Sequence, residues 1–271
     1  MVTGGLSNEG MITLLYHAKT VGPVCERLAE VGGFKVLRDL SNTDISGTIL
    51  RWGSVMPLLR YEGRVFNSSY AVSLSRDKKA SRQVLGDLSP VTWYRLADVR
   101  TPCVLRPRRH HGGYKFFVCN SGAEVLRATK RCRLGWYATE LVDKAEEYRV
   151  FVLQGRTVCV SRRFPGQHAI AWNLGMGGRL INVEKNEWPK IVVIAAINAT
   201  KRLGLDWAAI DIAVTKDGRT VVFEANTAPG LRNKYTINRI AKALSWADKN
   251  PPPPEAKGDT WKNLLHPGLT H

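Results

Sequence analysis

The 271-residue sequence lacks a long hydrophobic run, and its longest apolar stretch, IVVIAAINA from Ile191, is too short to span a bilayer. Its first ten residues, MVTGGLSNEG, do not combine a basic start with an apolar segment, so we expect no secretory leader. We therefore expect a cytoplasmic, soluble protein with no membrane partner.

Closely spaced cysteines are also missing, because the five cysteines are scattered and no Cys-x-x-Cys spacing occurs. This pattern argues against a zinc site and against a disulfide framework. We interpret the cysteines as small buried side chains in a reducing compartment. They are Cys25, Cys103, Cys119, Cys132 and Cys159.

Acidic residues are scarce. The sequence has 23 Asp and Glu against 40 Lys and Arg, a formal net charge of +17. The excess is concentrated between Arg100 and Arg163, with 14 Lys and Arg against 5 Asp and Glu, a net charge of +9. Such a field attracts nucleotides, nucleic acids or acidic protein tails, although generic solubility explains it equally well. No recognisable RNA- or DNA-binding motif accompanies it.

The N-terminal region alternates strand and helix patterns, which predicts a small α/β lobe with parallel strands over residues 1–88. Apolar strands are expected in MITLLYHA, FKVLRDL and GTILRW, and a helix in GPVCERLAEVGG. The stretch SRDKKASRQVLGDL predicts a further helix, with Ser75 as its cap.

Beyond this lobe the pattern predicts two α+β lobes, over residues 89–142 and 143–250. The first includes the strands PCVLRP and KFFVCN around a Gly-containing loop. The second includes a Gln154-Gly155 hairpin and two long helices. Four consecutive prolines from Pro251 predict an extended tail over residues 251–271. Together these patterns indicate the α/β class.

The stretch DIAVTKDGRTVVFEAN, Asp211 to Asn226, predicts a hairpin with a two-residue Asp-Gly loop. This register places Asp211 opposite Glu224, with Asn226 on the same face as Glu224. Like charges directly opposite each other destabilise a strand pair, and a divalent cation would offset the repulsion. An exposed, solvated acidic pair is the alternative, and a longer loop would break the pairing. The core-facing residues are expected to be Ile210, Ile212, Phe223 and Ala225.

Further candidates form a candidate phosphate site. In VLRPRRHHGGYKFFV, the loop around Gly112 and Gly113 can turn backbone N–H groups toward phosphates, with Arg106 as a fixed positive charge. An ordinary surface hairpin explains this stretch too, and the adjacent histidines are interpreted as exposed. Lys78 or Lys79, near a helix start, could point into a cleft or into water.

Three more segments carry candidate residues. Backbone groups of Glu140, Leu141 and Val142, between two lobes, could bind an adenine edge. Arg149 lies inside an apolar strand, where it either meets an anion or faces solvent. The Gly-rich stretch WNLGMGG contains Asn173 and follows Arg162 and Arg163. It indicates either close backbone approach to a ligand or a flexible loop.

The order of these motifs, from about Asn67 to Leu231, resembles the ATP-grasp superfamily. The most similar members join a carboxylate to an amine, as ribosomal-protein glutamate ligases and D-alanine–D-alanine ligases do. The resemblance implies an ATP-grasp fold, in which a small pre-grasp lobe precedes two α+β lobes that clasp ATP. It also implies ATP contacts from the following residues: Lys78, Arg106, Gly112, Gly113, Glu140, Leu141, Val142 and Glu147, the last on ribose.

The same resemblance implies Mg²⁺ bound by Asp211, Glu224 and Asn226, with Pro229-Gly230 following. Arg149, with Arg162 or Arg163, would stabilise the transferring phosphoryl group, and Asn173 would contact the acceptor or phosphate. The implied activity is ligation through an acylphosphate, with ATP and Mg²⁺ as cofactors.

Two rival functions stay open on the sequence. One is a nucleic-acid-binding protein on this scaffold, with a degenerate or regulatory ATP site, and the other is an ATP-grasp phosphotransferase. The basic charge favours an anionic carboxylate substrate, with a peptide, a protein tail or nucleic acid as candidate for the amine acceptor. The chain also resembles small ATP-grasp proteins of phages and bacteria, which implies the bacterial cytoplasm as its location.

Overall fold

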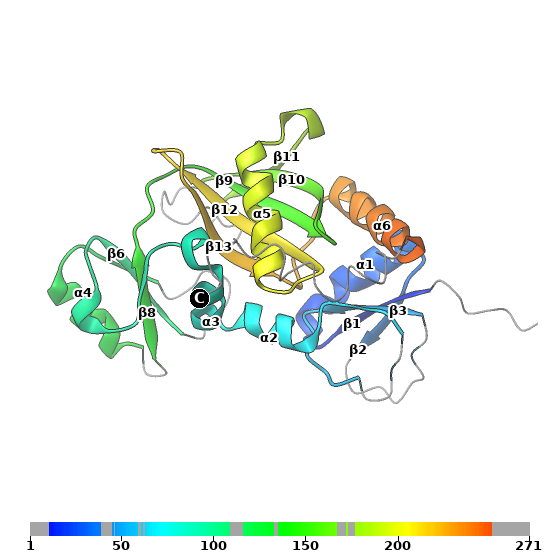
Figure 1. The fold of residues 1–271 in the computed structure, drawn as a ribbon, viewed down its shortest axis with the longest axis horizontal. Helices are drawn as coiled ribbons and strands as arrows, with labels where there is room; N and C mark the ends of the chain where they lie inside the picture. The colour runs from blue at the N-terminus through cyan, green and yellow to red at the C-terminus, as the bar shows by residue number, and fades with distance from the viewer. Residues whose placement is uncertain are drawn as a thin grey trace, which may run out of the picture.

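A computed structural model describes residues 11–38, 45, 47–58, 61, 63–108, 116–132, 135–166, 172 and 177–250. The described residues form three sheets with helices packed against them (Figure 1). No helix among them is long and apolar enough to cross a membrane. The predicted tail, residues 251–271, lies outside the described part of the chain.

The first sheet is parallel, as the strand–helix–strand alternation predicted. Its order is β2-β1-β3-β4, and α1 connects β1 to β2. Pro23 lies in the first turn of α1, and Gly33, with φ of 67°, ends the helix. The elements are β1 (Ile12–Tyr16), a 3-10 turn (Lys19–Val21), α1 (Gly22–Gly32), β2 (Lys35–Arg38), β3 (Thr48–Trp52) and β4 (Val65–Phe66).

Two short helices, α2 (Ser69–Arg76) and α3 (Lys78–Leu85), lead away from the first sheet, and a 3-10 turn (Gly86–Leu88) follows. The prediction of one helix capped by Ser75 is wrong. Asp77 is extended, with ψ of 101°, and its carboxylate accepts hydrogen bonds from the backbone N–H groups of Lys79 and Ala80. An aspartate that caps in this way starts a new helix at Lys78.

The second sheet is antiparallel, in the order β5-β8-β6-β7, and packs against α4. Its small core contains Cys103, Cys119 and Cys132, and all five cysteines are buried and unpaired, as expected. The elements are β5 (Thr92–Trp93), a 3-10 turn (Leu96–Asp98), β6 (Cys103–Pro107), β7 (Phe117–Cys119), α4 (Gly122–Lys130) and β8 (Trp136–Glu140).

The third sheet is the central one, antiparallel throughout, in the order β11-β10-β9-β12-β13. Helix α5 packs on one face, while α6 and α1 pack over part of the other (Figure 1). The elements are β9 (Lys144–Leu153), β10 (Arg156–Phe164), β11 (Arg179–Val183), a 3-10 turn (Lys185–Glu187), α5 (Lys190–Arg202), β12 (Trp207–Thr215), β13 (Thr220–Asn226) and α6 (Lys234–Lys249).

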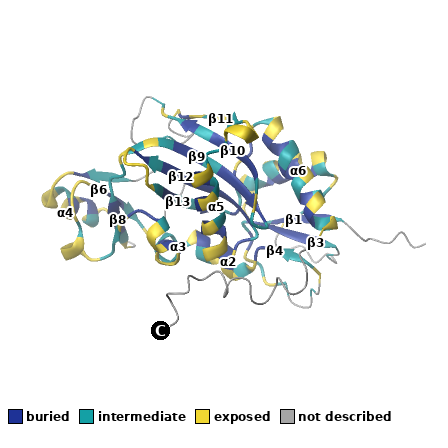
Figure 2. Ribbon diagram, turned by 45° about the horizontal axis from the view of Figure 1, so that its top comes forward, coloured by how far each residue is buried: buried dark blue, intermediate teal, exposed yellow. Residues whose placement is uncertain are grey.

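The first and central sheets share one hydrophobic core. Trp52 of β3 stacks on Trp207 of β12 with ring centroids 5.5 Å apart, and both rings are fully buried (Figure 2). Asn67, after β4, ties the same place together through its side chain. Its carboxamide accepts from the backbone N–H groups of Asp206 and Trp207 and donates to the Trp207 carbonyl. The central sheet is therefore anchored rigidly to the first lobe.

Candidate active site

The β12–β13 hairpin has a longer loop than its sequence predicts. The Thr215 N–H donates to the Arg219 carbonyl at 2.9 Å, so the loop contains three residues, ending in Gly218 with φ of 85°. The predicted pairing of Lys216 with Arg219 is wrong. Such a loop alone would shift the register by one residue.

A β-bulge at Phe223 restores the register. Ile212 pairs with Val222, whereas Asp211 pairs with Glu224, so Phe223 is the extra residue of β13. The predicted pairing of Asp211 with Glu224 is therefore confirmed, although two irregularities produce it. The bulge also puts Val222 into the core in place of Phe223, whose ring centroid lies 5.7 Å from Lys144 Nζ. The prediction that Phe223 faces the core is wrong.

Polar side chains form one row across all five strands of the central sheet. Glu224 pairs with Asp211, Asp211 with Arg149, Arg149 with Ser161, and Ser161 with Asn182. Because paired residues of adjacent strands project to the same face, all five side chains share one face of the sheet. The row joins the acids predicted on β12 and β13 to the arginine predicted on β9.

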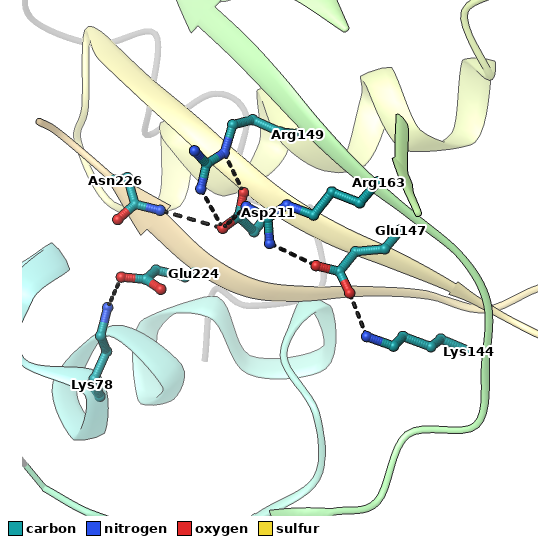
Figure 3. Close-up of polar contacts among 8 residues, drawn as sticks. All are labelled: Lys78, Lys144, Glu147, Arg149, Arg163, Asp211, Glu224 and Asn226. Atoms are coloured by element: carbon teal, nitrogen blue, oxygen red, sulfur yellow. Dashed lines mark hydrogen bonds and ion pairs between the residues drawn. The ribbon is translucent and has the colours of Figure 1, made fainter. Parts of the chain in front are cut away.

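Asp211 is compensated by arginines in this structure (Figure 3). Arg149 donates to both carboxylate oxygens, at 2.8 and 2.9 Å, and Arg163 donates to Oδ2 at 2.8 Å. Burial alone would raise the pKa of Asp211, but the two guanidinium groups outweigh it and lower the pKa to about 2. Cationic side chains thus supply the charge compensation that the sequence assigned to a metal ion.

Arg163 and Arg162 are neighbours on β10 with opposite orientations. Arg163 is buried and bridges Asp211 and Glu147, and these two acids raise its pKa although burial opposes the change. Arg162 projects from the other face of the strand and pairs with Glu146 at 2.7 Å. The structure therefore brings Arg163 into the candidate site and does not bring Arg162 there.

Glu224 and Asn226 carry the most accessible oxygen atoms of the row. The Glu224 side chain is 39% exposed and pairs with Lys78 through Oε1 at 2.5 Å. Burial would raise the pKa of Glu224, but Lys78 outweighs burial and lowers it. Asn226 points its amide nitrogen toward Asp211 Oδ2, at 3.5 Å. Glu224 Oε2 and Asn226 Oδ1 have no hydrogen-bond partner among the described residues.

Lys144 is a site residue that sequence reasoning missed. Its ammonium group pairs with Glu147 and lies 4.5 Å from the centroid of the Trp172 ring. Burial lowers the pKa of Lys144, and Glu147 opposes this shift, while the nearby charges of Arg163 and Arg106 add to it. Glu147, predicted to bind ribose, has both carboxylate oxygens engaged by cations.

The second sheet approaches the row from the side of α3. Arg108, just after β6, pairs with Asp77, the capping residue of α3, at 2.8 Å. Glu140 ends β8 and pairs with Arg219 of the hairpin at 2.9 Å. Leu141 and Val142 then connect the second sheet to the central one, as the predicted hinge requires. The predicted flap residues Gly112 and Gly113, and the predicted Asn173, lie outside the described residues.

The oxygen donors fit a divalent cation better than any other metal. Magnesium takes oxygen ligands and is commonly held by one or two carboxylates together with substrate phosphates. Within the described chain Glu224 and Asn226 offer free oxygens, and Asp211 is adjacent but held by Arg149 and Arg163. In the described ranges no three His, Cys, Asp or Glu side chains gather as a metal site. Softer metals are therefore not favoured here.

Comparisons with known proteins agree with this geometry. A probable alpha-L-glutamate ligase of Vibrio atlanticus is 29% identical over 210 residues, which are 69% of this chain and 68% of that protein. The chain spans about half to two thirds of the length of the curated relatives with this name.

Two solved structures share the fold. The ATP-grasp ligase PsnB, complexed with its minimal precursor, has a TM-score of 0.65 at 16% identity, over 88% of this chain and 99% of that chain. D-alanine–D-alanine ligase from Bacillus anthracis, complexed with ATP, has a TM-score of 0.60 at 18% identity, over 86% and 91%.

A family model described as an ATP-grasp domain, the second family of its clade, matches residues 92–243, more than half of the sequence. The resemblance inferred from motif order is confirmed, and so are the α/β ATP-grasp fold and the expectation of an enzyme. The chain belongs to this family of ATP-grasp domains.

Proposed function

We propose that this chain is an ATP- and magnesium-dependent ligase that joins a carboxylate to an amine through an acylphosphate. The observation that carries the proposal is the polar row, in which Glu224, Asp211 and Arg149 meet on one face beside Lys78. The names of the relatives support ligation, and a structure of PsnB with Mg and ADP supports the choice of metal.

The reaction has two steps. A carboxylate oxygen of the substrate bonds to the γ-phosphorus of ATP as the bond from that phosphorus to the bridging oxygen breaks, which releases ADP. The amine nitrogen then bonds to the acyl carbon, inorganic phosphate leaves, and the nitrogen loses a proton. Positioning and charge stabilisation are the main tasks left to the protein.

Glu224 and Asn226 would hold Mg²⁺, with Asp211 beside them. When bound, the ion would neutralise charge on the phosphates and align them for in-line attack. Lys78, which pairs with Glu224 through one oxygen, is placed to move onto a phosphate oxygen. Its lost partner is then replaced by the stronger charge of the nucleotide.

Arg149 is the residue best placed to bind the reacting anion. Its Nε and Nη2 atoms donate to Asp211, and its Nη1 atom has no acceptor among the described residues (Figure 3). The double hydrogen bond fixes the plane of the guanidinium group. Nη1 can then donate to the substrate carboxylate or to the transferring phosphoryl group without reorganisation. Arg163, which is buried, holds Asp211 and Glu147 in place.

Hydroxylamine trapping tests the proposal. The protein is incubated with ATP, Mg²⁺, hydroxylamine and either glutamate or a glutamate-containing peptide. An acylphosphate yields a hydroxamate that depends on ATP and on the carboxylate. Glu224→Gln should abolish the hydroxamate and leave the fold intact. A stable phosphorylated product without hydroxamate would indicate a phosphotransferase and would overturn ligation.

A further inference from the structure

The outer face of α6 carries alternating aromatic and basic side chains. Tyr235, Arg239, Lys242 and Trp246 are spaced by four, three and four residues, so they form one stripe along the helix. The inner face, with Ile237, Ile240 and Leu244 among its residues, packs into the core. Figure 2 shows exposed residues along the outer side of α6. Trp246 is 45% exposed and Tyr235 is 38% exposed.

Arginines cover the rings of this stripe. Arg156, at the start of β10, lies 4.6 Å from the centroid of the Trp246 ring. Arg239 lies 5.5 Å from the Tyr235 ring, and its Nε donates to the Val158 carbonyl at 2.9 Å. Stacking on a ring holds the planar guanidinium group in place with its edge free for a ligand.

The cations of this face differ from those of the site, which are paired with carboxylates. Lys234, Arg239, Lys242, Lys249 and Arg156 form no ion pair within the part of the chain that the structure describes. The only acid in the sequence of α6, Asp248, accepts a hydrogen bond from Thr48 of β3 and so points inward. The outer face of α6 therefore presents uncompensated positive charge over its described residues.

The stripe is continuous with the polar row. Asn182, the last residue of the row, accepts hydrogen bonds from Ser161 at 3.0 Å and from Asn233 and Thr236 at 3.4 Å. Asn233 caps the first turn of α6. Further along, Arg239 contacts Val158 and Trp246 contacts Arg156, so α6 follows β10 away from the site. The stripe therefore leads from the site over about 24 Å, the length of a 16-residue helix.

We propose that the outer face of α6 is a docking track for an acidic peptide, a substrate whose reacting group enters the site past Asn182. The proposal rests on the ligase function and adds its substrate class. Charge complementarity selects a polyanion, because the charged side chains of the stripe are all basic. Two features favour a peptide over single-stranded nucleic acid. Arginines already cover the ring faces on which bases would stack, and their forked edges match carboxylates.

Fluorescence anisotropy with a labelled oligoglutamate peptide tests the track, with an oligoserine peptide and an oligothymidylate as comparison probes. In Arg156→Glu/Lys242→Glu, both substitutions lie on exposed residues outside the site. The dissociation constant for oligoglutamate should rise at least about tenfold. A matched control, Arg127→Glu/Lys130→Glu on α4, reverses the same amount of exposed charge and should change it by less than about twofold.

Binding of a labelled ATP analogue with Mg²⁺ is measured in the same proteins, so that failure of the ligase proposal and failure of the track are seen separately. The track is overturned if the wild type binds oligoglutamate no better than oligoserine, or if the α6 and α4 variants lose binding equally. Tighter binding of oligothymidylate, lost in the α6 variant, would overturn the assignment to a peptide. Nucleotide binding should be unchanged in both variants.

Discussion

Arg149 and Asp211 face each other on β9 and β12 and are joined by two hydrogen bonds, which use both oxygens of the carboxylate. Arg163 adds a third bond to the same carboxylate. Asp211 is therefore an ion-pair centre before any metal or nucleotide is present. Stability and ligand binding should consequently depend on the same side chain.

The ion pairs of Asp211 predict a particular pH dependence of stability. Its folded-state pKa of about 2 lies below the ordinary value of 3.8, so the stabilisation is complete above about pH 4 and is lost as the pH falls toward 2. The contribution is about 2 kcal/mol, at roughly 1.4 kcal/mol per pKa unit. Urea unfolding of the wild type and Asp211→Asn at pH values from 2 to 5 measures it. Equal slopes in both proteins would contradict the ion-pair account.

Arg163 and Arg162 form a matched pair of adjacent arginines. Arg163→Gln leaves two buried carboxylates without a partner, so the free energy of unfolding should fall by about 3 kcal/mol. Arg162→Gln breaks one exposed ion pair and should cost less than about 1 kcal/mol. Denaturant midpoints compare the two variants. Similar costs would mean that the opposite orientation of these side chains is wrong.

Lys78 and Lys79 provide a second adjacent pair. Lys78 contacts Glu224, whereas Lys79 lies 5.0 Å from the ring centroid of Tyr94. Lys78→Met should weaken binding of an ATP analogue by at least about tenfold, because a charged hydrogen bond to phosphate is lost. Lys79→Met serves as the control and should bind nearly as well as the wild type. Titration calorimetry gives both affinities, and the reverse order would reassign the contact to Lys79.

Asn67 should be a stability residue rather than a site residue. It is fully buried, and its side chain makes three hydrogen bonds to the backbone at the start of β12. Asn67→Ala leaves these groups unsatisfied, so we expect a loss of about 3 kcal/mol in the free energy of unfolding. Asn250→Ala, at an exposed carboxamide, should cost less than about 0.5 kcal/mol. Thermal unfolding compares them, and a stable Asn67→Ala protein would contradict this role.

The hairpin shows how far the sequence could be interpreted. Alternation and the Asp-Gly turn predicted that Asp211 faces Glu224, and they do. The extra loop residue and the bulge at Phe223 could not be predicted, because the two irregularities cancel at that pair. They reappear only where local orientation matters, and so the ring of Phe223 lies near Lys144 instead of in the core.

Lys144 escaped prediction for a similar reason. Residues three apart on a regular strand project to opposite faces, so Lys144 and Glu147 should not meet. The register of β9 against β12 shifts next to Lys144, which turns both side chains to one face. Helix starts had a clearer signal, and α6 begins only three residues before its predicted start because Asn233 caps it. The choice between Arg162 and Arg163 required the pairing of three strands.

Manganese binding tests the central claim most directly, namely that Glu224 belongs to a metal–nucleotide site beside Asp211 and Lys78. Mn²⁺ is titrated into the wild type and into Glu224→Gln with a non-hydrolysable ATP analogue present, and bound metal is followed by electron paramagnetic resonance. Asp217→Asn, on the exposed hairpin loop, is the control. The account predicts nucleotide-dependent binding in the wild type and control, weakened at least about 100-fold in Glu224→Gln. Unchanged binding in a folded Glu224→Gln protein would contradict it.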